Sequence, residues 1–235
     1  MEIRGKSVLV TGGAVRVGAE ICRAFAAAGA RITIHCSTSR AAAEALAAAL
    51  PGTGHRVLAA DFTLPGAAEA LFAAAGRVDI LVNNASVYRL PGGDTPANAA
   101  VYRAVNLLAP YALLRLAVAQ PGPGAVVNVL DQAVLARNPG ESGAYLASRR
   151  RLAALTFAAA RRYAPRDWRI NAVAPGPMIP PRGLENSRMI HTLRSVPLGR
   201  PVAPGDLAAA ILFLAGCDSV TGAILPVDGG RRLHR

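Results

Sequence analysis

Short apolar runs alternate with longer, alanine-rich segments along most of the chain. The apolar runs, of which Val8-Leu9-Val10 is the first, are nearly continuous, which is typical of parallel strands that are buried on both faces. Strands that alternate with helices indicate an α/β protein with a doubly wound parallel sheet, right-handed crossovers and helices on both faces. We predict seven strands at residues 7–10, 31–35, 55–59, 78–83, 125–130, 169–174 and 223–227, and helices at residues 17–28, 39–50, 65–75, 97–119, 143–163 and 207–215.

The pattern continues from end to end without an internal repeat or a linker. A chain of 235 residues, 52% of them hydrophobic, is long enough to bury a core without disulfides. We therefore expect one domain over residues 1–235. The rhythm breaks at residues 176–204, where prolines interrupt every helical period, and we interpret this segment as a substrate loop.

Composition argues against a membrane protein and against a metal site. The longest charge-free apolar stretch, residues 116–130, is interrupted by Pro121-Gly122-Pro123-Gly124 and is too short to span a bilayer. The charged residues at the N-terminus run directly into the first strand, without the apolar stretch of a signal peptide. The three cysteines fit no zinc or disulfide spacing, so we expect reduced thiols in a cytoplasmic protein; they are Cys22, Cys36 and Cys217.

The formal net charge of +12 raises the question of a nucleic-acid partner. Lys6 is the single lysine, however, and the other 25 basic residues are arginines. Together with the abundance of alanine, this indicates a general composition bias. We therefore predict no nucleic-acid partner, and the alternative of nucleic-acid binding depends on net charge alone.

A glycine-rich turn follows the first strand and reads Thr11-Gly12-Gly13-Ala14-Val15-Arg16-Val17-Gly18. Glycines at this position allow a tight turn and a close approach of the backbone to a pyrophosphate, which then faces the N-terminus of the next helix. Because the turn lies between the first strand and the first helix, it indicates a dinucleotide site. The residues that we expect to line it are Gly12, Arg16, Val17 and Gly18.

Several further motifs occur in order along the chain and resemble those of the short-chain dehydrogenase/reductase family. They are the turn T-G-x-x-x-R-x-G, the pair Asp61-Phe62, the run Asn83-Asn84-Ala85-Ser86, Asn106 in the middle of a helix, Tyr145, the segment from Asn171 to Pro175-Gly176, and Val227-Asp228-Gly229-Gly230. The resemblance covers nearly the whole chain and implies a Rossmann domain that binds a nicotinamide cofactor. Arg16 in the turn and the N-N-A-S form are similar to the pteridine reductases and the dihydromonapterin reductases.

The end of the second strand indicates which cofactor is bound. NAD is usually selected there by an acidic residue, and this strand ends without one. Hydroxyl groups and a cation accept a 2′-phosphate, so we predict NADPH, with the phosphate near Ser37, Thr38, Ser39 and Arg40. Ser39 is also an expected helix N-cap. The resemblance implies that Asp61 and Phe62 contact the adenine and that Asn84, Ala85, Pro175 and Gly176 line the rest of the cofactor site.

The resemblance also implies the catalytic residues, with two departures. Tyr145 is the expected proton donor, and Asn106 is the family's helix asparagine. Where the family has a lysine four residues after the tyrosine, this chain has Arg149, which keeps the positive charge but differs in shape and donor geometry. Where most members have a catalytic serine, this chain has Asp131, as in the pteridine reductases. Asp131 alternatively caps a loop, and Tyr145 is alternatively a core aromatic residue.

The expected substrate site is made by Arg16, Ser86, Tyr88, Asp131, Tyr145 and Met178. The resemblance implies that Tyr88 stacks a flat heteroaromatic ring against the nicotinamide; its alternative is half-buried packing. We predict an NADPH-dependent reductase of a pterin or dihydropterin. The alternatives are a carbonyl or 3-oxoacyl thioester reductase and, because of Arg149, a catalytically silent NADPH-binding protein. The resemblance further implies a homotetramer or homodimer formed through helices 97–119 and 143–163.

Overall fold

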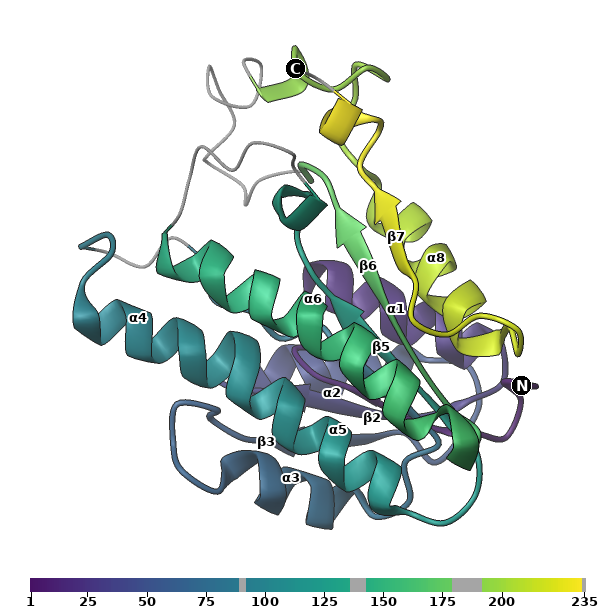
Figure 1. Ribbon diagram of the computed structural model, residues 1–235. Helices are drawn as coiled ribbons and strands as arrows, with labels where there is room; N and C mark the ends of the chain where they lie inside the picture. The colour runs from purple at the N-terminus through teal and green to yellow at the C-terminus, as the bar shows by residue number, and fades with distance from the viewer. Residues whose placement is uncertain (89–91, 136–142, 179–191, 234–235) are drawn as a thin grey trace.

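A seven-stranded parallel sheet lies at the centre of the computed structural model, which describes residues 1–88, 92–135, 143–178 and 192–233 (Figure 1). The strand order is β3-β2-β1-β4-β5-β6-β7, so the chain winds outward from β1 in both directions. The predicted doubly wound fold is confirmed. The strands are β1 (Ser7–Val10), β2 (Arg31–Cys36), β3 (Arg56–Ala59), β4 (Ile80–Asn83), β5 (Gly124–Val129), β6 (Trp168–Pro175) and β7 (Ile224–Val227).

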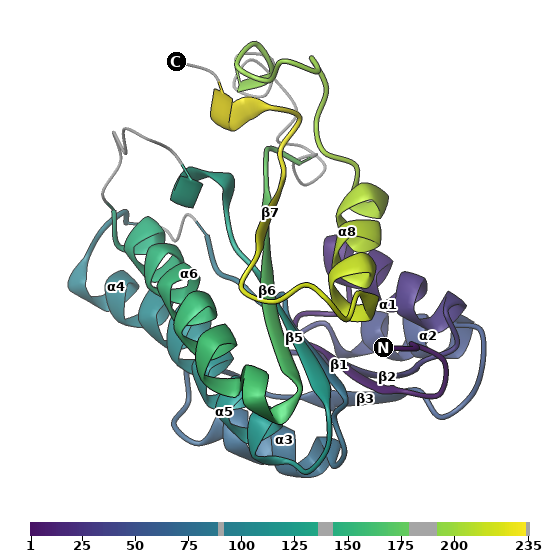
Figure 2. The same ribbon diagram turned by 45° about the vertical axis from the view of Figure 1, so that its right-hand side comes forward.

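Helices cover both faces of the sheet. One face carries α1 (Arg16–Ala27), α2 (Arg40–Ala49) and α8 (Pro204–Gly216), and the other carries α3 (Ala67–Ala75), α4 (Pro96–Arg103), α5 (Ala109–Ala119) and α6 (Ala144–Tyr163). Figure 2 shows these two helical layers edge-on, with the sheet between them.

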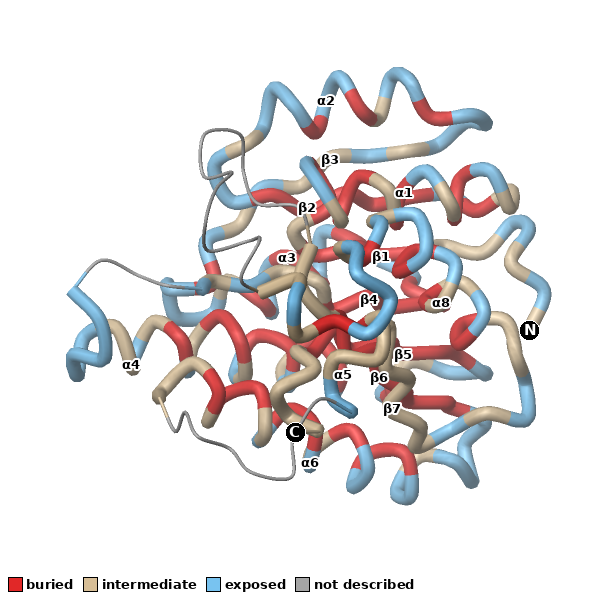
Figure 3. Tube along the Cα trace, turned by 90° about the horizontal axis from the view of Figure 1, so that it is seen from above, coloured by how far each residue is buried: buried red, intermediate tan, exposed pale blue. Residues whose placement is uncertain are grey.

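Alternate residues of each strand enter different cores. Val8 and Val10 of β1 pack with the α1 and α8 side, while Leu9 between them packs with the α3 and α5 side. The buried positions therefore run without a break along the central strands (Figure 3). This two-sided burial is the physical reason that the strands read as continuous apolar runs in the sequence.

The predicted helix at 97–119 is continuous, but its middle has a different pitch. The segment Ala104–Leu108 (η1) is a π-helix, closed by a hydrogen bond from the Ala109 N–H to the Ala104 carbonyl. Pro110 follows at once, and a proline has no N–H for the carbonyl four residues before it, here that of Asn106. The wider turn accommodates the proline ring, and π-turns inside α-helices are frequent at functional sites.

By length and composition, this continuous helix, Pro96–Ala119, is the one in the described residues that would suffice to cross a membrane. Half of its most apolar stretch is buried inside the protein. Its apolar residues, among them Leu113, Leu114 and Ala117, belong to the core between α5 and the sheet. The apolar character is thus explained by packing in the core of this fold.

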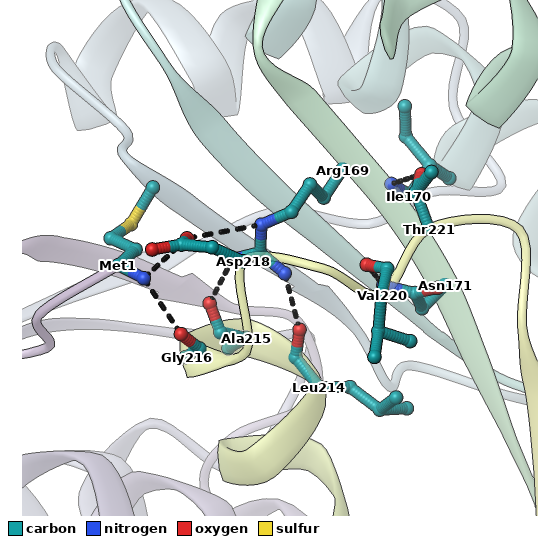
Figure 4. Close-up of polar contacts among 10 residues, drawn as sticks. All are labelled: Met1, Arg169, Ile170, Asn171, Leu214, Ala215, Gly216, Asp218, Val220 and Thr221. Carbon is teal, nitrogen blue, oxygen red and sulfur yellow. Dashed lines mark hydrogen bonds and ion pairs between the residues drawn. The ribbon is translucent and has the colours of Figure 1, made fainter.

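A polar cluster ties β6 to the end of α8 (Figure 4). The buried guanidinium of Arg169 donates from Nη1 to the Leu214 carbonyl at 2.7 Å and from Nη2 to the Ala215 carbonyl. Its Nε lies 3.6 Å from the carboxylate of Asp218, which also accepts from the Met1 amino group. A cation at a helix C-terminus satisfies carbonyls that the helix leaves without partners.

Gly124, the first residue of β5, provides a test of how tightly β5 packs against Trp168 of β6. A Cβ at Gly124 would overlap the ring of Trp168, which is fully buried. We expect Gly124→Ala to lower the free energy of unfolding by about 1–3 kcal/mol, because the ring has no room to move. Gly205→Ala is the control, since open space surrounds that helical position, and it should stabilise by up to about 1 kcal/mol. Equal urea midpoints for the two variants would contradict this packing.

Candidate active site

The glycine-rich turn joins β1 to α1 at the carboxyl end of the sheet. Gly12 has a φ of +61°, and Arg16, the first residue of α1, has a φ of +52°. A Cβ at Gly18 would overlap the Gly12 carbonyl oxygen and lie 2.8 Å from the Cα of Gly13. The first turn of α1 therefore rests directly on the glycine turn, and the N–H groups at the helix N-terminus open toward the place where an anion would bind.

Thr11, the first residue of this turn, and the residues that follow β4 hold its other side in place. The Asn84 amide donates to the carbonyls of Thr11 and Gly12, at 2.9 and 3.0 Å. The Thr11 hydroxyl accepts from the backbone N–H groups of Asn84 and Ala85, both at 3.0 Å. The predicted cofactor residues Asn84 and Ala85 thus hold the turn in shape from the neighbouring strand.

The residues predicted to surround the 2′-phosphate lie together after β2. Ser37, Thr38 and Arg40 are exposed, and Ser39 is half-buried at the N-cap position of α2. Ser39 makes no capping hydrogen bond through its side chain, so its expected role as an N-cap is wrong in that respect. Arg40 bonds to Glu44 at 2.8 Å, one turn along α2, an ion pair that the sequence analysis missed.

The two residues expected to contact the adenine, Asp61 and Phe62, follow β3 and differ in how far they are buried. Asp61 is exposed, and its Oδ1 accepts from both the N–H and the hydroxyl of Thr63, which lowers the pKa of its carboxyl. Phe62 is buried and stacks on the ring of His35, with centroids 4.4 Å apart. His35 was not predicted as a site residue, although a histidine inside an otherwise apolar strand is an unusual feature of the sequence.

Tyr145, Asp131 and Arg149 meet where β5 ends and α6 begins. The Tyr145 hydroxyl donates to Oδ2 of Asp131 at 3.0 Å. The other carboxylate oxygen, Oδ1, accepts from the Ala133 N–H at 2.9 Å, so Asp131 caps its loop and also faces the tyrosine. The Arg149 guanidinium lies over the Tyr145 ring, with its Cζ 5.6 Å from the ring centroid.

The environment of Tyr145 decides how readily it gives up its proton. Burial raises the pKa of the phenol above its ordinary value, the positive charge of Arg149 lowers it, and the carboxylate of Asp131 raises it. Arg149 is only 2% exposed. Its Nη1 donates to the Val129 carbonyl at 3.1 Å, and its Nε is buried without a hydrogen-bond partner among the described residues.

Two further tyrosines surround the Tyr145 ring. Tyr88, 56% exposed, lies with its ring centroid 4.7 Å from that of Tyr145 at an interplanar angle of 58°. Tyr102 of α4 approaches the same ring edge-on at 5.9 Å and was not predicted. Of the remaining expected substrate residues, Arg16 and Ser86 are exposed, and Met178 pairs with Val202 in an isolated parallel bridge. Residues 179–191 of the predicted substrate loop lie outside the described residues.

Asn106 lies fully buried in the π-turn and binds the segment that leads to Tyr88. Its Oδ1 accepts from the Val87 N–H, and its Nδ2 donates to the Val87 carbonyl, each at 3.0 Å. A second buried set, not predicted from the sequence, anchors α6 to the sheet: Asn83 donates to Asn128, and Asn128 donates to Thr156, both at 2.9 Å. These hydrogen bonds hold the segment that leads to Tyr88 and the helix α6 that carries Tyr145.

The residues present fit a dinucleotide with a nicotinamide end. The close contact at Gly18 leaves room only for backbone against the turn, as a pyrophosphate cradle requires. The unpartnered Nε of Arg149 is a donor for which a ribose hydroxyl is a suitable acceptor. Pro175 is the last residue of β6 at the same edge, and the N–H of the following Gly176 donates to the Val227 carbonyl at 2.9 Å. Among the described residues, no cluster of His, Cys, Asp and Glu could hold a metal ion.

The fold and this site define a nicotinamide-dependent oxidoreductase, and known proteins agree. A family model described as "Enoyl-(Acyl carrier protein) reductase" matches residues 13–232. Galactitol 2-dehydrogenase (L-tagatose-forming) of Cereibacter sphaeroides is 38% identical over 96% of this chain and 94% of its own length. The chain belongs to the short-chain dehydrogenase/reductase family.

Solved structures of similar proteins agree with this assignment. FolM alternative dihydrofolate reductase 1 from Brucella canis, complexed with NADP, has a TM-score of 0.86 and 30% identity over 99% of this chain and 96% of its own. A blue fluorescent protein from a metagenomic library, in complex with NADPH, has a TM-score of 0.88 and 32% identity over 98% of this chain and 99% of its own. The predicted enzyme class and its nicotinamide cofactor are therefore confirmed at the level of the family.

The contact between α1 and the turn gives a direct test of the cofactor site. In Gly18→Ala the new methyl group would overlap the Gly12 carbonyl, so we expect α1 to shift away and the Kd for NADPH to rise at least about tenfold. Isothermal titration calorimetry measures the change, with Gly205→Ala as the control for a harmless added methyl group. Unchanged NADPH affinity in a folded Gly18→Ala variant would exclude this turn as the pyrophosphate site.

Proposed function

We propose that this protein is an NADPH-dependent reductase of a pterin or dihydropterin. The observation that carries the proposal is the 3.0 Å hydrogen bond from the Tyr145 hydroxyl to Asp131, beside the exposed ring of Tyr88. A carboxylate and a phenol together suit the protonation of a ring nitrogen, and an aromatic face at the same place suits a flat substrate. The neighbouring dihydrofolate reductase structure supports this choice.

Three residues of the chain have separate roles in the proposed reaction. NADPH, when bound, would supply a hydride for the carbon of a ring C=N bond. Tyr145 gives the proton to the nitrogen, and the buried charge of Arg149 stabilises the phenolate that this leaves. Asp131, already hydrogen-bonded to the phenol, then relays a proton from solvent and restores Tyr145. One hydride and one proton are consumed for each C=N bond reduced.

The rest of the site orients the substrate. Tyr88 stacks the heterocycle, and Arg16 and Ser86 approach its polar edge. Met178 and the substrate loop near 176–204 surround the remainder. In this proposal residues 1–235 form a single NADP-binding domain, and the protein is cytoplasmic. The exposed groups after β2 hold the 2′-phosphate. Asn106, in the π-turn, acts by holding the segment that carries Tyr88.

A second candidate is a carbonyl reductase acting on a small ketone, a sugar or a 3-oxoacyl thioester. The 38% identity with a galactitol 2-dehydrogenase favours it. Asp131 argues against it, because carbonyl reductases of this family use a serine at this position to bind the carbonyl oxygen, and an ionised carboxylate has no hydrogen to donate to that oxygen. A third candidate, a silent NADPH-binding protein, is favoured by Arg149, whose guanidinium is committed to the Val129 carbonyl.

The substrate class is tested by NADPH oxidation with 7,8-dihydromonapterin and 7,8-dihydrobiopterin, beside a ketose and a 3-oxoacyl thioester. We expect turnover with a dihydropterin, and we expect Tyr145→Phe to lower kcat by a factor of about 10²–10⁴, because it removes the proton donor. Tyr163→Phe, the same substitution at the opposite end of α6, is the matched control and should retain activity.

The three candidates give different results in this assay. Turnover of the ketose or the thioester alone would replace the pterin proposal by the carbonyl reductase. NADPH binding without turnover of any of these substrates, unchanged in Arg149→Lys, would favour the silent binding protein. Retained pterin reduction in Tyr145→Phe would remove Tyr145 from the mechanism.

We further propose that the chain forms a homodimer, or a homotetramer containing that dimer, through helices 97–119 and 143–163. Leu108, Tyr111 and Phe157 are large apolar side chains that these neighbouring helices leave 40–51% exposed. Two copies of such a face would bury one another. Phe157→Asp should halve the molar mass in sedimentation equilibrium, whereas Leu64→Asp, at an exposed position on another part of the surface, should leave it unchanged. A monomeric wild-type protein would contradict this assembly.

A further inference from the structure

His35 lies buried in β2, between the glycine turn and the end of β3. Its Nδ1 accepts a hydrogen bond from the Gly12 N–H at 3.1 Å, and its Nε2 lies 3.0 Å from the Ala60 carbonyl. Its own carbonyl accepts from the Gly13 N–H at 2.8 Å. Two successive N–H groups of the turn are therefore bound to one residue, the first by the side chain and the second by the backbone.

These contacts determine the protonation state of the ring. A backbone N–H is always a donor, so Nδ1 facing Gly12 must be the acceptor. The Ala60 carbonyl is always an acceptor, so Nε2 must carry the proton. Burial lowers the pKa of His35, which agrees with a neutral ring. An imidazolium would place two donors, Nδ1–H and the Gly12 N–H, against each other.

The His35 ring lies between two parts of the expected cofactor site. Gly12 begins the turn on which the first helical turn of α1 rests, and Ala60 precedes the predicted adenine pair. The ring also stacks on Phe62, the second residue of that pair, at 4.4 Å. The same side chain thus touches the part of the site for the pyrophosphate and the part for the adenine.

We propose that His35, in its neutral Nε2–H form, is a positioning residue that sets the glycine turn for the dinucleotide and fixes its spacing from the adenine wall. It acts through the Gly12 N–H and not by touching the reacting atoms. Because His35 already binds the N–H groups of Gly12 and Gly13, the pyrophosphate would be bound by the N–H groups that follow, at the start of α1. The inference depends on the nicotinamide cofactor of the family and not on the pterin substrate.

The test separates the two ring nitrogens by substitution. His35→Asn keeps an acceptor at the distance of Nδ1, whereas His35→Gln keeps a donor at the distance of Nε2 and loses the acceptor for Gly12. We expect His35→Gln to raise the Kd for NADPH about tenfold and His35→Asn to remain within about threefold of the wild type, because one hydrogen bond to the turn is lost in the first and kept in the second.

His55 provides a matched control for general loss of stability. Its Nδ1 accepts from the Ile32 N–H at 3.1 Å and its Nε2 lies 3.0 Å from the Pro51 carbonyl, so it makes the same pair of bonds away from the glycine turn. His55→Gln should lower Tm without changing the Kd for NADPH. Calorimetry measures binding, and thermal unfolding of each apo variant measures stability.

A spectroscopic measurement on the unsubstituted apo protein keeps the proposal testable if a His35 variant fails to fold. The ¹⁵N shifts of His35 should show a protonated Nε2 and an unprotonated Nδ1 near neutral pH. An Nδ1–H tautomer, NADPH affinity of His35→Gln equal to that of the wild type, or equal losses in His35→Asn and His35→Gln would each overturn the proposal. These results do not depend on the pterin proposal, because calorimetry with NADPH, thermal unfolding and the ¹⁵N shifts are all measured without a substrate.

Discussion

The structure depends on one constraint, the parallel direction of all seven strands. Parallel strands bring their carboxyl ends to the same edge of the sheet, so residues far apart in the sequence meet there without any special folding of the loops. The glycine turn follows β1, Asn84 follows β4, Asp131 follows β5 and Gly176 follows β6. Helices on both faces exclude water from the sheet and leave this edge as the place where polar chemistry is possible.

The most demanding group at that edge is the buried guanidinium of Arg149. A buried cation is tolerated only when its donors have partners, and here the Val129 carbonyl and the face of Tyr145 provide part of that environment. Its Nε is buried without a hydrogen-bond partner among the described residues, so a ligand hydroxyl in reach of this atom would find an unused donor. Arg149 and Asp131 therefore act together on Tyr145: the positive charge of Arg149 lowers the pKa of its phenol, and the carboxylate of Asp131 raises it.

The architecture could be predicted from the sequence because strands that are buried on both faces consist almost entirely of apolar residues. It also placed Tyr145, Asp131 and Asn106 in the correct elements, since each follows a recognisable strand or lies in a recognisable helix. It did not predict His35, Tyr102 or the chain from Asn83 through Asn128 to Thr156. Their roles depend on partners in other strands and helices, and such partners have no fixed spacing along the chain. Local chemistry misled in one case, where Ser39 occupies a capping position without making the capping bond.

The π-turn before Pro110 determines what the long helix can contact. One residue more in a turn rotates everything after it by about 100° relative to a regular α-helix. The helix uses this rotation: α4 presents Tyr102 toward Tyr145, while α5 presents Leu113 and Leu114 to the core against the sheet. The π-turn lies between these two contacts, so one continuous helix supplies side chains both to the hydrophobic core and to the group of tyrosines beside Asp131.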